Sequence, residues 1–366
     1  MEEQTIESQK NSTQMQFFGK GSEYFGIIIV NWLLTVLTLG IYYPWARARK
    51  IRYMYGATAL NNDRFAFHGT GKEMFRGFVK VIIFYAVLMG ALYAAMWYYR
   101  ENPTGLLIFV LLFYIVFFAV IPLIIHGAYR YRMSRTTWRG IRFGYRGEKQ
   151  QLYINFFKWL GLTFVTLGVY ISWFEINLRK YLVGNIRTGD IKFEYKGNGW
   201  GLFKICMKYF APIFAGVFVI CICMMVMSNV AGDTIEWGAF SYLWIVVTII
   251  MVFVYGFALI YYCWFEKNVW NYYIDNIELK KDEQKIELKS SVTGGGIFKL
   301  RFVNFLMTVF SLGLAYAWVE VRTRKYFTEN ITLTGDIDLD KISQTEEIYT
   351  DAAFESAGDF FDIDIF

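Results

Sequence analysis

The chain has 366 residues, of which 56% are hydrophobic and 20% aromatic, and its formal net charge is +6. A water-soluble chain of this length is usually closer to about 45–50% apolar, so the composition indicates a membrane protein. The four cysteines lie within or beside apolar stretches, which disfavours a disulfide framework. The start, MEEQTIESQK, is acidic and polar, so we do not expect a cleavable signal peptide.

Four stretches of the chain are long, apolar and free of charge. In chain order they are Val81–Tyr99, Leu106–Ile125, Tyr209–Val230 and Ala239–Phe265. At a rise of about 1.5 Å per residue, each helix can cross a hydrocarbon core of about 30 Å. We therefore predict a polytopic α-helical integral membrane protein.

A second kind of apolar element recurs three times. It reads TLGIYYPWARARK at 38–50, TLGVYISWFEINLRKY at 166–181 and SLGLAYAWVEVRTRKY at 311–326. The fixed offsets of 128 and 273 residues indicate internal repeats. They divide the chain into a polar N-terminal segment (1–16), repeat unit one (17–147), repeat unit two (148–290), a partial unit three (291–340) and an acidic C-terminal tail (341–366).

Short polar modules separate the apolar elements, and each is predicted to form a β-hairpin. One of them, NIRTGDIKFEYKGNG, carries a Thr-Gly-Asp turn between two alternating runs. The five modules lie at 59–71, 135–147, 185–199, 276–291 and 330–340. The sequence thus predicts helical elements with short cytoplasmic β-hairpin modules between them.

Lys and Arg residues predict the orientation in the membrane. The ranges 47–80 and 130–158 each hold eight of them, whereas 229–238 holds none. Because cytoplasmic loops carry the excess of positive charge, we expect the polar modules and both termini to face the cytoplasm. Inverted repeats would place many of these basic residues outside the cell, so we do not favour them.

The TLGxY elements are predicted to break rather than to run straight through the bilayer. Glycine is the usual residue just after a helix, and proline suits the first turn of the next one. We assign helix breaks to Gly40, Gly168, Gly313 and Pro44. Two alternatives stay open: four spans with re-entrant TLGxY elements, or seven spans in which those elements cross fully.

The motifs FHGTGKEMFRGF and TLGIYYPWARARKIRYMYGAT carry a resemblance to a known family. Together they resemble the YjgN-like bacterial inner-membrane proteins, a family catalogued as a domain of unknown function, and the resemblance covers roughly 17–340. It implies a bacterial inner-membrane location and several spans. It offers no catalytic or binding residues to carry over.

Two groups of residues are candidates for function. Asn31 and Asn304 occupy matching positions and are candidates either for interhelix hydrogen bonds or for a polar cavity. The basic residues beside the TLGxY elements and spans are candidates for anionic-lipid contact: Arg47, Arg49, Lys50, Arg52, Arg130, Arg132, Arg179, Lys180, Arg322, Arg324 and Lys325.

No catalytic set, metal-ligand cluster or phosphate loop appears in the sequence, so we expect no enzyme and no cofactor or metal. The expected partner is the lipid bilayer, including anionic headgroups, while nucleic acid is disfavoured. Two functions stay open: a transporter or channel for an uncharged or lipid-like solute, and a non-transporting scaffold, lipid-organising or envelope-stress protein. The residues 340–366 carry a net charge of −7, which predicts electrostatic contact between this tail and the basic hairpins, with a solvated tail as the alternative.

Overall fold

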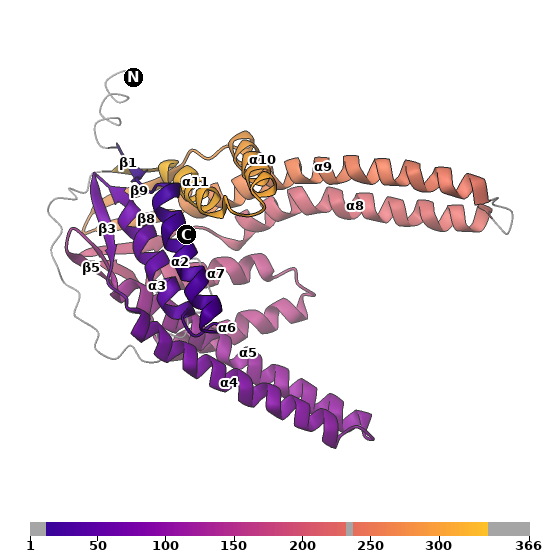
Figure 1. The fold of residues 1–366 in the computed structure, drawn as a ribbon, viewed down its shortest axis with the longest axis horizontal. Helices are drawn as coiled ribbons and strands as arrows, with labels where there is room; N and C mark the ends of the chain where they lie inside the picture. Colours follow the sequence, from indigo (N-terminus) through magenta and orange to yellow (C-terminus); the bar gives the residue numbers. More distant parts are fainter. Residues whose placement is uncertain (1–11, 232–236, 336–366) are drawn as a thin grey trace.

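Ten strands close into one antiparallel barrel (Figure 1). The structure is a computed structural model, and it describes residues 12–231 and 237–335. Around the barrel the strand order is β1-β10-β9-β8-β7-β6-β5-β4-β3-β2. The strands are β1 (Ser12–Phe17), β2 (Thr58–Leu60), β3 (Asp63–Phe67), β4 (Thr136–Trp138), β5 (Ile141–Tyr145), β6 (Ile186–Thr188), β7 (Ile191–Tyr195), β8 (Ile277–Lys281), β9 (Gln284–Ser290) and β10 (Ile331–Gly335).

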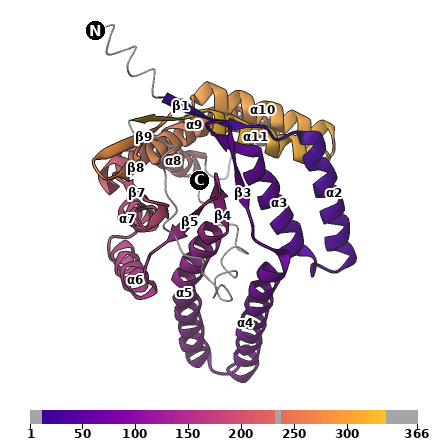
Figure 2. The same cartoon turned by 90° about the vertical axis from the view of Figure 1, so that its left-hand side faces the viewer.

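Helices come in pairs, and each pair leaves the barrel after one strand and returns to the next. The pairs are α2 (Gly21–Leu37) and α3 (Tyr43–Ala57), α4 (Gly71–Tyr98) and α5 (Pro103–Ser134), α6 (Lys149–Val165) and α7 (Ile171–Gly184), α8 (Gly199–Ala231) and α9 (Trp237–Asp275), and α10 (Gly294–Phe310) and α11 (Tyr316–Glu329). Because the strands alternate in direction, these pairs all leave from one end of the barrel. The longest of them, α4–α5 and α8–α9, extend far beyond the strands (Figures 1 and 2).

At the opposite end of the barrel, two-residue turns connect the two strands of each hairpin. The turn between β2 and β3 has Asn61 and Asn62 at φ values of 51° and 67°, and the turn between β4 and β5 has Arg139 and Gly140 at 53° and 77°. Positive φ at both central residues is the geometry that suits the right-handed twist of a hairpin. These turns therefore define a turn end, opposite the helix end.

The predicted fold class is wrong, and two findings overturn it. The polar modules are not separate hairpins, because their strands join into a single closed barrel. Among the described residues, moreover, only α4 and α5 are long and apolar enough to cross a membrane. An isolated hairpin is at best marginally stable in water and exposes two unpaired edges, and closing a barrel removes both problems.

The strand that closes the barrel, β1, comes largely from residues 1–16, which the sequence analysis predicts to be a polar N-terminal segment. Strand β1 pairs with β10, where Thr13 faces Leu333, and with β2, where Phe17 faces Thr58. It thereby takes the place beside β10 where the sequence predicts the second half of the fifth hairpin. That half, the acidic tail 341–366 and residues 1–11 lie outside the described residues.

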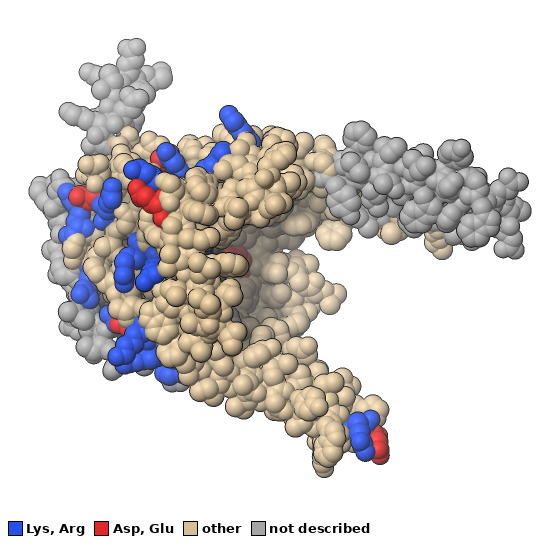
Figure 3. Space-filling view, in the orientation of Figure 1, with Lys and Arg blue, Asp and Glu red and all other residues tan. Residues whose placement is uncertain are grey.

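The helices α4 and α5 form an apolar arm. At about 1.5 Å per residue, their 28 and 32 residues give lengths of about 42 and 48 Å. Only 6% of the most apolar window of each helix is buried by the rest of the protein. Between its basic base and its tip, over residues 81–99 and 102–129, the arm carries no Asp, Glu, Lys or Arg. At the tip (Figure 3), Arg100 pairs with Glu101 at 3.5 Å. The other predicted pair of spans lies within α8 and α9, where many side chains lie outside the described residues.

Each TLGxY element is a helical hairpin and not one straight helix. In the first, Leu39 has a φ of 51° and Gly40 a φ of 90°, and the Gly40 amide donates to the Thr35 carbonyl at 2.7 Å. The hydroxyl of Thr38 then accepts from the Tyr42 amide at 2.9 Å, at the start of α3. Leu39 and not Gly40 is thus the first left-handed residue after the helix, in a Schellman turn.

The same turn recurs in the other two elements. Gly168 and Gly313 have φ values of 90° and 88°, and their amides donate to the carbonyls of Thr163 and Thr308, each at 2.8 Å. Pro44 lies in the first turn of α3. The leucines at the three tips, Leu39, Leu167 and Leu312, are 94–96% exposed.

Replacing Gly40 by alanine should destabilise the protein. A new Cβ would meet nothing within 4 Å, so the cost is the backbone strain of a left-handed L-residue, about 1–2 kcal/mol. Gly26, inside α2, has equally open space but no positive φ, and Gly26→Ala should be neutral or stabilise by up to about 1 kcal/mol. Thermal unfolding in detergent compares the two variants, and equal stabilisation by both would contradict the strained turn.

Candidate functional site

The barrel encloses an apolar lumen to which all ten strands contribute. Its cavity volume is about 310 Å³, within the range of about 300–1,000 Å³ that is usual for small-molecule sites. Side chains alternate across each strand, so every second residue points inward. The inward residues include Met15, Phe17, Leu60, Phe65, Trp138, Phe143, Ile191, Phe193, Leu279, Leu288, Ile331 and Leu333.

The turn end of the lumen is filled by aromatic side chains. Trp138, the last residue of β4, is 3% exposed, and its indole N–H donates to the Asp63 carbonyl at 3.1 Å. Phe65 packs beside it, with 6.3 Å between the ring centroids. Outside them, Arg139 pairs with the Asp63 carboxylate at 2.6 Å. The lumen is therefore closed at this end by packed side chains and an ion pair.

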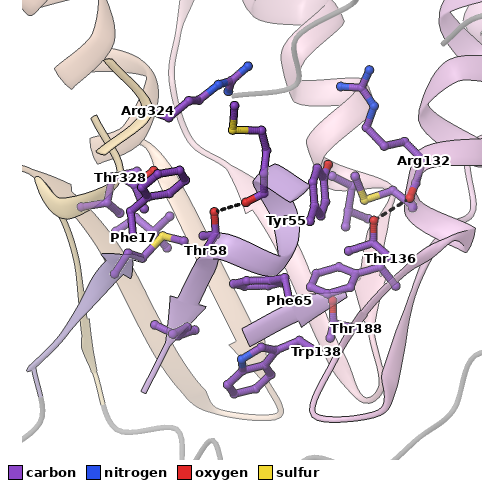
Figure 4. Close-up of a pocket in the computed structure, with 18 of the residues that line it drawn as sticks. Phe17, Tyr55, Thr58, Phe65, Arg132, Thr136, Trp138, Thr188, Arg324 and Thr328 are labelled. Atoms are coloured by element: carbon purple, nitrogen blue, oxygen red, sulfur yellow. Dashed lines mark hydrogen bonds between the residues drawn. The ribbon is translucent and has the colours of Figure 1, made fainter. Parts of the chain in front are cut away.

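The helix end of the lumen forms a basic mouth. It is lined by residues of α3, α5, α9 and α11, among which are Arg47, Lys50, Arg132 and Arg324. Figure 4 shows Arg132 and Arg324 at one end of the pocket and Trp138 at the other. Of the described residues that line the lumen, none is acidic. The mouth therefore has a positive potential above an apolar interior.

Two of the mouth cations are held by contacts outside the lumen. The Lys50 ammonium pairs with the Glu320 carboxylate at 2.7 Å, and Glu320 also accepts from the Tyr24 hydroxyl at 2.8 Å. Arg47, which is 7% exposed, donates to the Tyr43 hydroxyl at 3.3 Å. These contacts fix the mouth between α3, α11 and α2.

Two uncharged polar groups of the lumen have no hydrogen-bond partner within the described part of the chain. The Thr188 hydroxyl on β6 is one, and this residue is 4% exposed; the indole N–H of Trp270 on α9 is the other. By contrast, the hydroxyls of Thr58 and Thr136 donate to helix carbonyls at 3.0 and 2.7 Å. A buried polar group without a partner costs about 1–3 kcal/mol, so each such group invites a ligand atom or water.

The remaining predicted lipid contacts lie outside the lumen, on α3, α5, α7 and α11. Arg49 lies over the Tyr42 ring at 5.7 Å, and Arg179 over the Tyr273 ring at 3.7 Å. Arg52 donates to the Gly69 carbonyl at 3.0 Å, and Arg322 contacts the Met307 sulfur at 3.3 Å. The full set lies on α3, α5, α7 and α11, where these helices return to the barrel, and we call it the basic collar: Arg47, Arg49, Lys50, Arg52, Arg130, Arg132, Arg179, Lys180, Arg322, Arg324 and Lys325.

Basic residues of the β-hairpins themselves pair with acids of neighbouring strands. Across β7 and β8, Lys280 pairs with Glu194 and Lys196 with Glu278. The hydrogen bond from Lys280 holds the pKa of the Glu194 carboxyl below its usual range. The helices therefore supply the cations at the mouth, whereas ion pairs between neighbouring strands neutralise part of the charge on the hairpins.

Asn31 and Asn304 each connect the two helices of a hairpin. Asn31 donates to the Ala46 carbonyl at 3.2 Å, and Asn304 to the Thr323 hydroxyl at 3.0 Å. Asn304 also lines a second pocket, of about 300 Å³, between α10 and α11. Within the described residues, no group of three or more His, Cys, Asp or Glu side chains is placed to hold a metal ion.

The lumen itself is absent from the sequence-based site prediction. Its apolar residues alternate along the predicted hairpins, which is a visible signal, but nothing local indicates that five hairpins share one interior. Nothing in the sequence around Thr188 or Trp270 marks them as site residues, because only the folded structure shows that their polar groups have no hydrogen-bond partner among the described residues. The charged residues were found because charge density can be read directly from the chain.

Fold and site together define a helix-bearing β-barrel protein with an apolar lumen, a basic mouth and an exposed apolar arm. The chain belongs to the family described as bacterial protein of unknown function (DUF898), whose sequence profile matches residues 12–360. This confirms the resemblance seen in the sequence.

The chain is also similar to individual bacterial proteins. The chain is 26% identical over 372 residues to inner membrane protein YjgN of Salmonella typhimurium, covering 90% of this chain and 91% of the relative. It is 33% identical over 142 residues to the protein of the same name from Escherichia coli O157:H7, covering 38% of this chain and 33% of the relative. No solved structure matches the chain. The names of the relatives support an inner-membrane location.

Proposed function

We propose that this protein binds anionic lipid at the cytoplasmic face of the inner membrane, in a binding and not a catalytic role. In this arrangement the α4–α5 arm is inserted across the bilayer and the barrel lies outside it. The observation that carries the proposal is the position of the basic collar, between the barrel and the exposed apolar arm. Cations at that level meet the headgroups of an anionic leaflet, at about 1 kcal/mol for each residue near the surface.

The distribution of charge supports the cytoplasmic side. The arm begins after Lys72, Arg76 and Lys80 and returns at Arg130 and Arg132, which fits the excess of positive charge on the cytoplasmic side. Strand β1 begins, and β10 ends, at the turn end of the barrel. A cytoplasmic barrel therefore places both ends of the described chain in the cytoplasm.

The TLGxY hairpins fit the same arrangement as re-entrant elements. Helix α2 has 17 residues, about 25 Å at a rise of about 1.5 Å per residue, which is shorter than a hydrocarbon core of about 30 Å. The exposed leucines at the tips would lie in hydrocarbon, while the arginines at the bases reach the headgroups. A transporter is the other function open from the sequence, but packing of Trp138 in the turn end supports a one-ended binding site over passage through the barrel.

Neutralising exposed collar residues should lower the selectivity for anionic lipid. The double variant Arg49→Gln/Lys180→Gln removes two exposed cations from different helices, for an expected loss of about 2 kcal/mol in preference for anionic over zwitterionic lipid. Quantitative mass spectrometry of the lipids retained around the protein in mixed nanodiscs measures this preference.

Lys285→Gln is the control, because it removes an exposed charge from β9, beside the turn end of the barrel and away from the membrane. It should leave the preference unchanged. The difference between the two variants should shrink at high salt, as the Debye length falls from about 10 Å at 0.1 M to about 3 Å at 1 M. The same enrichment of anionic lipid in the wild type and the double variant would refute the proposed function.

A further inference from the structure

We infer that the barrel lumen is a binding site for a single-chain anionic phospholipid, with its acyl chain inside the barrel and its phosphate at the basic mouth. The inference rests on the proposed function, because it names a ligand that the membrane would supply. The two kinds of binding differ, because the basic collar contacts many headgroups at once, whereas the lumen holds one molecule.

The shape of the lumen favours one acyl chain. Eight-stranded barrels already have room for one small ligand, and here ten strands surround a cavity of about 310 Å³. Its wall is built of Phe, Leu, Ile, Met and Trp side chains, and Trp138 closes the turn end. An acyl chain that enters the lumen from the helix end therefore stops at Trp138.

The chemistry of the mouth favours a phosphate head. Arg132 and Arg324 line it from different helices (Figure 4), while Arg47 and Lys50 are held by Tyr43 and Glu320. Guanidinium groups bind phosphate oxygens through paired hydrogen bonds. The indole N–H of Trp270, on the neighbouring α9, is a buried donor with no partner in the described structure, so the mouth also offers a neutral donor.

The direction of the opening gives the source of the ligand. The mouth is at the barrel end from which all the described helix pairs leave, including the apolar arm. With the arm in the bilayer, the mouth faces the headgroup layer. A single-chain phospholipid of that layer has its head toward the barrel, so it must turn over at the mouth for its acyl chain to enter the lumen, and its phosphate then stays at the level of the arginines.

The buried Thr188 hydroxyl indicates that the lumen is more than a packed apolar core; because a hydrocarbon chain offers no hydrogen bond, the partner of this hydroxyl in the occupied lumen is water and not the lipid. The hydroxyl lies deep in the lumen, near Trp138 in Figure 4, in a residue that is 4% exposed. It has no partner among the described residues, whereas Thr58 and Thr136 do. A lumen designed only for packing would place an apolar side chain there at lower free energy.

The test is native mass spectrometry of the full-length protein in detergent, titrated with 1-oleoyl-lysophosphatidylglycerol. We expect saturable binding of one molecule per chain. Monooleoylglycerol, which has the same chain and no charge, should bind at least tenfold more weakly, because it lacks the charge-assisted hydrogen bonds. This comparison needs no variant of the protein.

Arg324→Gln should weaken binding of the lysophospholipid about tenfold and leave binding of monooleoylglycerol unchanged. Lys285→Gln is the control, because this exposed residue of β9 belongs neither to the lumen lining nor to the basic collar. It should bind like the wild type. Arg324→Lys keeps the positive charge and should recover part of the affinity, which separates the loss of the contact from a loss of folding.

Several results would overturn the inference. Equal binding of the charged and neutral lipids would show that the basic mouth does not contribute to binding. Stronger binding of oleate than of the lysophospholipid would show that the site prefers a carboxylate to a phosphate. Binding that appears only after removal of residues 336–366 would assign the lumen to the acidic tail. In each of these cases the proposed function still stands if anionic lipid is enriched around the protein in nanodiscs. If lysophospholipid binds the lumen but nanodiscs show no such enrichment, the proposed function fails and the inference about the lumen stands.

Discussion

Replacing Phe17 by alanine should destabilise the protein by about 3–5 kcal/mol, the usual cost of removing a buried phenylalanine from a core. Phe17 is 4% exposed, lines the lumen and faces Thr58 across the β1–β2 pair. It belongs to the strand that closes the barrel, so the loss of its packing weakens the joint between β1 and β2. Chemical unfolding in detergent, followed by circular dichroism, measures the change.

Phe18→Ala is the control for this prediction. Phe18 is the next residue in the chain but is 44% exposed, and its main described contact is with Arg64, at 5.3 Å from the ring. An exposed cation–π contact contributes about 0.5–1 kcal/mol, so this variant should lose no more than that. Comparable losses in the two variants would contradict a barrel closed by β1.

The parts of the fold that could be predicted depend on local interactions. The break after Thr38 rests on a Schellman turn and on a hydroxyl that caps the next helix four residues later, so the residues that make it are adjacent in the sequence. The two-residue hairpin turns, such as the one at Gly140, are local in the same way. Short-range patterns of this kind can be read from one sequence.

The closed barrel could not be predicted because its pairings span the chain. Thr13 pairs with Leu333, and the STQMQF segment that forms β1 has no strong strand pattern of its own. The candidate site divides in the same way. Charge alone selects both Arg322 and Arg324, but only the fold places Arg324 at the lumen and Arg322 against Met307.

The proposed function places the barrel on the cytoplasmic side of a membrane that the α4–α5 arm crosses. Thr104, at the tip of the arm, and Asp282, in the turn between β8 and β9, are both exposed in the structure. Single cysteines at these two positions, in a background that lacks the four native cysteines, report the side of the membrane on which each one lies.

Labelling spheroplasts with an impermeant maleimide tests this claim most directly. We expect Thr104→Cys to react in intact spheroplasts and Asp282→Cys to react only after the membrane is permeabilised, because the charge-free run of residues 81–99 is long enough to cross the hydrocarbon core. Reaction of Asp282→Cys from outside, or protection of Thr104→Cys until permeabilisation, would contradict it.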